Sequence, residues 1–273
     1  LRAYDEKLDI EVKVTAGSAA NLRLISQDYL QLAIAQTDLI SNAVNAAGVF
    51  EGSEPLSGFS AVTGLYTEAC QIIVSADSDI ETVRDLKGKK ISIGEAESGT
   101  EQNALEILSA YGLSDKIVTE VNMNYTDAAD ALKKGEIDAF FCTAGVQTTV
   151  VEELARQHDI RLLPVDGEEA DMLLSEYNFY TAYTIPAGTY TGQDADTDTL
   201  GIRAVLIASD ELSEDTVKQI TQGIFDHASQ LQYSVPVDFT LTPEEGTRDM
   251  PAPFHKGAAA YYEEQGITVD TAE

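Results

Sequence analysis

The chain has 273 residues, which is enough for two compact domains at roughly 100–200 residues per domain. A hydrophobic fraction of 44% and a charged fraction of 23% are typical of a globular protein and exclude a disordered or fibrous chain. The 47 acidic residues outnumber the 17 basic ones, and the formal net charge of -30 repels phosphate backbones and anionic lipids, which argues against nucleic acid as a partner.

Neither a membrane span nor a disulfide scaffold is indicated. No run reaches the roughly 18 apolar residues of a span, and Leu1 leads into polar sequence without a basic and then apolar leader. Two cysteines are too few for a disulfide scaffold, and their spacing leaves open whether Cys70 and Cys142 pair.

The N-terminal part predicts a strand, a helix and a second strand before a long β run. Residues 1–8 read as the end of a helix whose start is absent, which predicts that an N-terminal element is missing. Residues 10–16 alternate apolar and polar side chains with period two, as in a half-buried strand. The predicted elements that follow are a helix carrying Leu22, Ile25 and Tyr29, a strand at 32–36, a loop at 48–58 and a β run at 59–76.

Strands and helices then alternate. Ser78 and Glu81 form a predicted capping box before a short helix at 83–86, and Thr126 is the predicted cap of a helix that stops at Gly135. The other predicted strands lie at 90–94, 116–121, 137–142, 160–165, 179–185 and 202–208, and the other helices at 99–111, 147–157, 213–231 and 256–265. This order predicts the α/β class, with a mostly parallel sheet and helices on both faces.

The segment from Gly94 to Asn103 is the most informative. A strand ends there in small residues and a helix starts at once, with Ser98 and Glu101 spaced as a capping box across Gly99 and Thr100. A helix N-terminus offers free N–H groups and about half a positive charge, which suits a carboxylate. The alternative is a helix cap without a ligand, and phosphate is less suited because the lysine of a P-loop is missing.

Two further turns resemble this arrangement, and a tyrosine is a separate candidate. Thr143 and Gly145 follow a buried strand, and ligands of parallel sheets lie at the carboxyl ends of strands. Gly17 and Ser18 open the first predicted helix in the same way, and Tyr66 has a ring and a hydroxyl that could line a cleft. Ordinary turns and a packed tyrosine are the alternatives.

Metal sites and catalytic groups find little support. Carboxylates at Asp194, Asp196 and Asp198 start like a calcium loop, but Thr199 and Val205 stand where the loop needs glycine and a bidentate glutamate. The three histidines lack zinc spacing, and Cys142 has no sequence partner that would make it a nucleophile. We therefore expect no metal, no cofactor and no catalytic residue.

Several stretches resemble the TAXI-type solute-binding receptors of tripartite ATP-independent periplasmic (TRAP) transporters, and together they span almost the whole chain. The chain departs from this family at its N-terminus, where a strand and a Gly-rich, Tyr-containing turn would be expected. The stretches are 33–38 (AIAQTD), 85–94 (DLKGKKISIG), 98–103 (SGTEQN), 140–145 (FFCTAG), 185–190 (IPAGTY) with 192–194 (GQD), and 253–257 (PFHKG).

The resemblance implies a type II periplasmic-binding-protein fold, with two α/β lobes joined by two crossing strands. Residues 1–69 and 203–273 would form lobe 1, residues 74–199 lobe 2, and the hinge strands would lie near 70–73 and 200–202. Such a receptor is periplasmic or extracytoplasmic, captures a small carboxylate such as glutamate or a dicarboxylate, and delivers it to a TRAP permease. The expected ligand-binding residues are Ser98, Gly99, Thr100, Thr143, Gly145, Tyr66, Gln36 and Ser18.

The alternative function is an enzyme of the lyase or dehydratase type on the same scaffold, because a fold does not settle function. It would need a titratable acid/base pair at the ligand, for which Glu97, Glu101 and Asp38 are the candidates. A DNA-coupled sensor would need a basic patch, which is absent.

Overall fold

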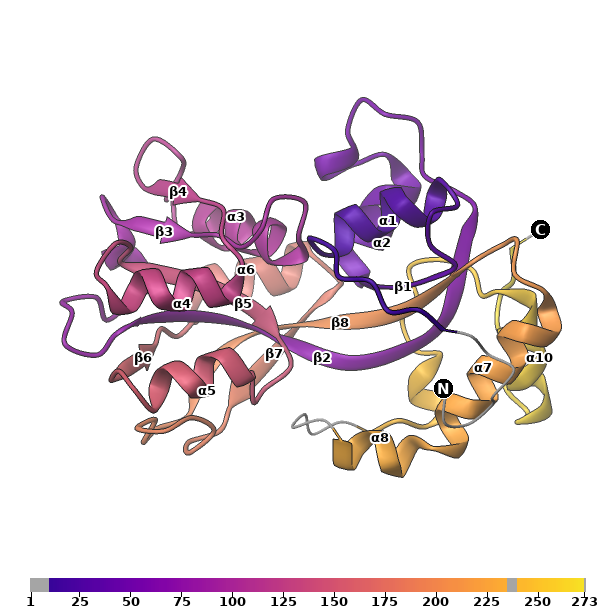
Figure 1. Ribbon diagram of the computed structural model, residues 1–273. Coiled ribbons are helices and arrows are strands. Elements are labelled where there is room, and N and C mark those ends of the chain that lie inside the picture. Colours follow the sequence, from indigo (N-terminus) through magenta and orange to yellow (C-terminus); the bar gives the residue numbers. More distant parts are fainter. Residues whose placement is uncertain (1–9, 235–239, 273) are drawn as a thin grey trace. The chain divides into compact units, whose positions relative to one another are not determined.

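The computed structural model describes residues 10–234 and 240–272 (Figure 1). Its contacts divide the chain into unit 1, Leu1–Tyr66 with Arg203–Glu273, and unit 2, Thr67–Ile202. The chain passes from one unit to the other within two long strands, β2 (Phe59–Ser75) and β8 (Thr197–Ser209). The helix end predicted at residues 1–8 lies outside the described residues.

Unit 2 is built on a mixed sheet. Its strand β5 (Ala139–Ala144) lies between β2, to which it is antiparallel, and β3 (Lys90–Ser92), to which it is parallel. The remaining strands are β4 (Thr119–Val121), parallel to β3; β6 (Ile160–Leu162), antiparallel to β2; and β7 (Tyr180–Ile185), antiparallel to β8. The helices are η2 (Val83–Leu86), α3 (Gly99–Ala110), α4 (Tyr125–Lys133), α5 (Thr149–Ala155) and α6 (Gly167–Glu176).

The prediction of a mostly parallel sheet is wrong. Among the described strands with a given register, only β3 pairs in parallel, with β4 and β5, and α3 and α4 are the helices that connect these three strands. The β1–β8, β2–β5, β2–β6 and β7–β8 pairs are antiparallel.

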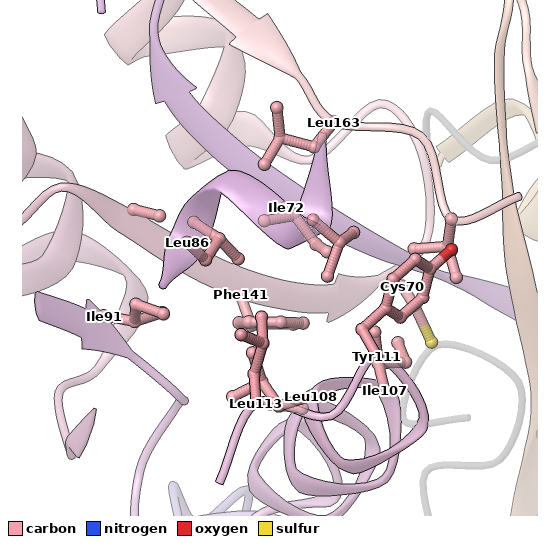
Figure 2. Close-up of a cluster of buried hydrophobic side chains, with 14 of the residues drawn as sticks. Cys70, Ile72, Leu86, Ile91, Ile107, Leu108, Tyr111, Leu113, Phe141 and Leu163 are labelled. Carbon is pink, nitrogen blue, oxygen red and sulfur yellow. The ribbon is translucent and has the colours of Figure 1, made fainter. Parts of the chain in front are cut away.

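Alternation along β2 and β5 gives the unit 2 sheet two buried faces. Cys70, Ile72 and Phe141 face the cluster shown in Figure 2, which includes Ile107 and Leu108 of α3. Their neighbours in sequence belong to a second cluster, which contains apolar residues of α4 and α5. Helices therefore cover both faces of the sheet, and α3 is held with its first turn near the end of β5.

Unit 1 has its own core. Its strand β1 (Leu32–Gln36) pairs antiparallel with β8, from Leu32 opposite Ala208 to Gln36 opposite Ala204. Buried apolar residues of its helices pack together with Ala33 and Ala35 of β1. The helices that contribute to this cluster are α1 (Ser18–Ser26), α2 (Thr37–Asn45), η1 (Gly48–Phe50), α7 (Glu214–Asp226) and α10 (Lys256–Glu264). Unit 1 also contains α8 (Ala228–Ser234) and α9 (Pro243–Gly246).

The strand predicted at residues 10–16 is wrong. This segment pairs with no strand of the described part, and Val12 and Val14 are 85% and 98% exposed. Period-two alternation describes a strand only where a neighbouring strand completes its hydrogen bonds and a core covers its apolar face.

Some helix boundaries also differ from those predicted. Thr82 and Asp85 form the capping box of η2, in place of Ser78 and Glu81. Asn124 caps α4 in place of Thr126, because its Oδ1 accepts the N–H of Asp127 at 2.8 Å. The long helix predicted at 213–231 is two helices that meet at His227, and α6 was not predicted.

Candidate ligand-binding site

The first turn of α3 is buried and partly capped. Ser98 Oγ accepts the N–H of Glu101 at 3.0 Å, which confirms the predicted capping role of Ser98. Gly99 and Thr100, the first two residues of α3, are buried. Gly94 has a φ of 93°, and a Cβ there would lie 2.8 Å from Thr100 Cβ, so only glycine lets the chain pass this close to the helix start.

Tyr125 joins this turn to the end of β5 in a closed ring of hydrogen bonds. Its hydroxyl donates to the carbonyl of Thr143 at 2.9 Å and lies 2.6 Å from Thr100 Oγ1. The N–H of Thr143 donates to Thr100 Oγ1 at 3.3 Å, which completes the ring. The structure therefore brings Thr100 and Thr143 together, and burial raises the pKa of Tyr125 well above its ordinary value, so its hydroxyl keeps its proton.

The hydroxyl of Thr143 itself has no hydrogen-bond partner in the described part of the chain. Thr143 is only 4% exposed, and its Oγ1 is buried. A buried hydroxyl without a partner costs about 1–3 kcal/mol, so such a group in a native protein needs an explanation. It lies on the strand that ends beside the first turn of α3, where a ligand acceptor would satisfy it.

A second polar network, which was not predicted from the sequence, supports the turn after β5. Gln71 Nε2 donates to Thr148 Oγ1 at 3.0 Å, Tyr190 donates to Gln71 Oε1, and Thr148 Oγ1 donates to the carbonyl of Gly145 at 2.9 Å. Its members are up to 119 residues apart, so no local pattern reveals it. Only Tyr190 carried a signal, as part of the 185–190 stretch.

A negative charge, that of Glu68, lies near this site. Glu68 precedes the β2 residues Ala69 and Cys70, which pair with Ala144 and Thr143. Its charge contributes to the raised pKa of Tyr125 and Cys142, although burial is the main cause in both. The pKa of Cys142 reaches about 12, so this thiol is neither a nucleophile nor an anion at neutral pH.

The two cysteines do not pair. Both are free and fully buried, and they belong to different apolar clusters, on opposite faces of the unit 2 sheet.

In unit 1 the structure brings Ser18 and Gln36 together. Ser18 Oγ accepts the backbone N–H of Gln36 at 3.2 Å, and both residues are buried. Tyr66 is half-buried in β2, at the last position of the first segment of unit 1.

Two of the three titratable candidates for an enzyme, Glu101 and Asp38, have structural roles. The Glu101 carboxylate accepts the N–H of Glu97 at 2.8 Å and the Asn122 amide at 2.7 Å. Asp38 Oδ1 accepts the N–H of Leu39 at 2.6 Å within its own helix.

Two carboxylates of the acidic loop at 194–198 form hydrogen bonds within the protein. Asp196 accepts the N–H of Ala187, and Asp198 accepts a hydrogen bond from the hydroxyl of Thr184. Over residues 10–234 and 240–272, no three His, Cys, Asp or Glu side chains gather as a metal would require. In the same residues, no helix has the length and apolarity that crossing a membrane requires.

Known structures resemble this one at low sequence identity. A protein of Bordetella bronchiseptica RB50 is 18% identical with a TM-score of 0.53, over 98% of this chain and 76% of that one. The alkanesulfonate-binding protein SsuA of Xanthomonas axonopodis pv. citri, bound to MOPS, is 18% identical with a TM-score of 0.46, over 92% and 78%. The periplasmic aliphatic sulphonate binding protein SsuA of Escherichia coli is 16% identical with a TM-score of 0.45, over 90% of this chain and 66% of that one.

The structure has the predicted α/β class, with strands β2 and β8 shared between two units. The sequence identifies the family independently, because the model of the NMT1-like family matches residues 2–266. This match covers nearly the whole chain, and the protein therefore belongs to the NMT1-like family.

Proposed function

We propose that this protein is an extracytoplasmic solute-binding receptor that captures a small carboxylate and delivers it to a TRAP permease, without catalysis. The partially capped first turn of α3 supports it, together with the buried, unpartnered hydroxyl of Thr143 beside that turn. The proposed delivery to a TRAP permease rests on the sequence resemblance to TAXI receptors. The proposed periplasmic location rests on that resemblance and on the fold.

The carboxylate would accept hydrogen bonds from the N–H groups of Gly99 and Thr100 and from the hydroxyl of Thr143. Ser98 and Gly145 would shape the site, and Ser18, Gln36 and Tyr66 would be the ligand contacts of unit 1. A protein with a net charge of -30 holds an anion only where fixed donors point at it, and a hydrogen bond to a charged group contributes about 1.5–3 kcal/mol.

Of the two ligand classes, glutamate suits the site better than a dicarboxylate. Glu68 places a negative charge near Tyr125, and this charge attracts the ammonium group that glutamate has and a plain dicarboxylate lacks. We therefore expect L-glutamate to raise the melting temperature more than glutarate, which has the same carbon chain without the ammonium.

The test is Thr143→Val, which keeps the shape of the side chain and removes its hydroxyl. Because that hydroxyl has no partner, the ligand-free variant should be as stable as the wild type or up to about 1–2 kcal/mol more stable, while affinity for L-glutamate falls about tenfold. Calorimetry and thermal melts measure the two effects, and Gly99→Val, which blocks approach to the backbone, should weaken binding similarly.

Thr221→Val is the matched control. Thr221 is also buried, but its hydroxyl donates to the carbonyl of Val217 at 2.8 Å in α7. It should leave affinity unchanged and gain no stability. Equal affinity of the wild type and folded Thr143→Val and Gly99→Val variants would contradict the proposed site, and no stabilisation by any small carboxylate would contradict the function.

A further inference from the structure

Strand β6 has one free edge in the unit 2 sheet. It pairs antiparallel with β2, and no other strand of the described residues pairs with it. In an antiparallel pair, residues that hydrogen-bond to the partner strand alternate with residues whose N–H and C=O groups point away from it. Asp159 and Leu163 are of the first kind, because the carbonyl of Asp159 accepts the N–H of Ala76 and the N–H of Leu163 donates to the carbonyl of Ile72.

The residues that alternate with these two, Ile160 and Leu162, therefore direct their N–H and C=O groups to the free edge. None of these four groups has a hydrogen-bond partner within residues 10–234 and 240–272. A row of unpaired backbone groups of this kind is a template for pairing with another extended chain.

A groove lies at this edge. Its volume is about 360 Å³, and it is lined by residues 160–162 and Pro164 on one side and by residues 192–197 on the other. Residues 192–197 are the end of the connection from β7 to β8, so the groove belongs to unit 2 alone. Neither Thr143 nor the first turn of α3 lines it. The groove is therefore separate from the proposed carboxylate site.

The charges of the groove select its occupant. Asp194 and Asp196 line it, and Asp194 is exposed with no hydrogen-bond or ion-pair partner among the described residues. Arg161 is the positive charge of the lining, but its guanidinium donates to the carbonyls of Ala76 and Ile80, in the turn after β2. The exposed carboxylates therefore favour a basic occupant over an acidic one.

We propose that this groove is a docking site for a partner protein, which adds an extended segment carrying lysine or arginine to the free edge of β6. The backbone of that segment pairs with Ile160 and Leu162, and its basic side chain lies against Asp194 and Asp196. Backbone pairing supplies affinity in such strand addition, and the side chains supply specificity. The docking site goes beyond the proposed function and does not depend on the carboxylate site.

The probe is the fluorescein-labelled peptide TVKVKVT, and fluorescence anisotropy at physiological ionic strength measures its dissociation constant. Ile160→Pro removes one N–H of the free edge and keeps the hydrogen bonds to β2, because Ile160 does not bond to β2. Ile160→Ala is the matched control, since it also removes the isoleucine side chain but keeps the N–H. The dissociation constant of the Ile160→Pro variant should be at least about fivefold above that of the Ile160→Ala variant.

A second pair of variants tests the charge of the groove. Asp194→Asn neutralises a carboxylate that has no partner in the described part of the protein, and it should raise the dissociation constant about threefold. Asp171→Asn removes one charge at an exposed position of α6 outside the groove lining and should leave the dissociation constant unchanged.

Hydrogen-exchange NMR on the wild type locates the peptide without any substitution. The amides of Ile160 and Leu162 should exchange fast in the free protein and more slowly with bound peptide, because they then donate to it. The amide of Leu163 already donates to Ile72 and should change little.

The outcomes separate this docking site from other occupants and from the proposed function. No saturable binding of the peptide, equal dissociation constants in Ile160→Pro and Ile160→Ala, or bound peptide without slower exchange at Leu162 overturns it. Self-association of the wild type that Ile160→Pro abolishes, measured by analytical ultracentrifugation, overturns it in favour of a second copy of the chain. Affinity for L-glutamate should be equal in the wild type and Ile160→Pro, so the docking site and the carboxylate site fail separately.

Discussion

Single side chains decide what the site can do, and Tyr125 is the clearest case. The sequence placed Ser98, Thr100 and Thr143 at two strand ends that were expected to face one ligand, but it named no side chain that joins them. The link is the Tyr125 hydroxyl, which contacts Thr100 and Thr143 from a helix of its own. Such a contact depends on tertiary packing, which local capping and turn patterns do not encode.

Glu106 shows how burial sets a pH dependence at one residue. Its carboxylate accepts hydrogen bonds from Tyr180 and from Gln102, yet burial raises its pKa above the ordinary value, with a smaller contribution from the charge of Glu176. The folded state therefore binds this proton more tightly than the unfolded state does. Its contribution to stability falls as pH rises from about 4.5 through the raised pKa.

We predict that Glu106→Gln raises the free energy of unfolding at pH 7.5, because it removes a buried carboxylate charge. The gain should be smaller at pH 5.0, where a larger fraction of Glu106 in the wild type is protonated. Urea unfolding followed by circular dichroism at both pH values measures the difference. Glu153→Gln, at an exposed position of α5, controls for the loss of one negative charge and should change stability by less than about 0.5 kcal/mol. A gain that is equal at both pH values would contradict the assignment.

Among the helices and strands, the predictions from sequence were most accurate where neighbouring residues alone determine the structure. The β run at 59–76 corresponds to β2, and the helix at 99–111 to α3, since a long apolar run and a Ser98 cap act locally. Residues 10–16 failed because a strand needs a partner that the pattern does not name. The pairing of β2 with β5 and of β8 with β1 is antiparallel. Strand direction depends on the path of the chain between the strands, which no local sequence pattern records.

Helix α10 illustrates a contact that only one residue type permits. Gly257 lies in its first turn, and a Cβ there would meet the backbone carbonyl oxygen of Glu214, in α7, at 2.2 Å. Alanine favours a helix interior by about 1 kcal/mol over glycine, but a clash with backbone cannot be relieved by turning a side chain. The steric cost should therefore exceed the gain in helix propensity.

We predict that Gly257→Ala lowers the free energy of unfolding by about 2 kcal/mol or more, measured by urea denaturation. Lys256→Ala is the neighbouring control at an exposed position and should change it by less than about 0.5 kcal/mol. If Gly257→Ala were stabilising, the close approach of α10 to α7 would be wrong.

For the whole molecule the dominant property is its charge. Ion pairs such as Lys218–Glu264 (2.6 Å) and Lys89–Asp79 (2.9 Å) involve basic residues, but acidic residues outnumber basic ones by 30 over the full chain. Carboxylates therefore far outnumber the basic groups that could pair with them, and their mutual repulsion opposes the compact state. Salt screens charges that lie more than about 8–10 Å apart near 0.1 M ionic strength.

We predict that raising sodium chloride from 0.05 to 0.5 M increases the melting temperature by a few degrees, on the order of 1 kcal/mol of stability. Potassium chloride should act equally, because the effect is one of screening rather than of a specific ion. A melting temperature that falls with salt in both series would mean that the ion pairs outweigh the repulsion.

The two cysteines have a practical consequence. They are the only thiols of the chain, and both are fully buried. A maleimide should therefore modify the folded protein only when local or global opening exposes them. The rate of that modification therefore measures how often unit 2 opens or unfolds. A new cysteine at an exposed position such as Val49 could be labelled with a fluorophore while the two native cysteines are kept.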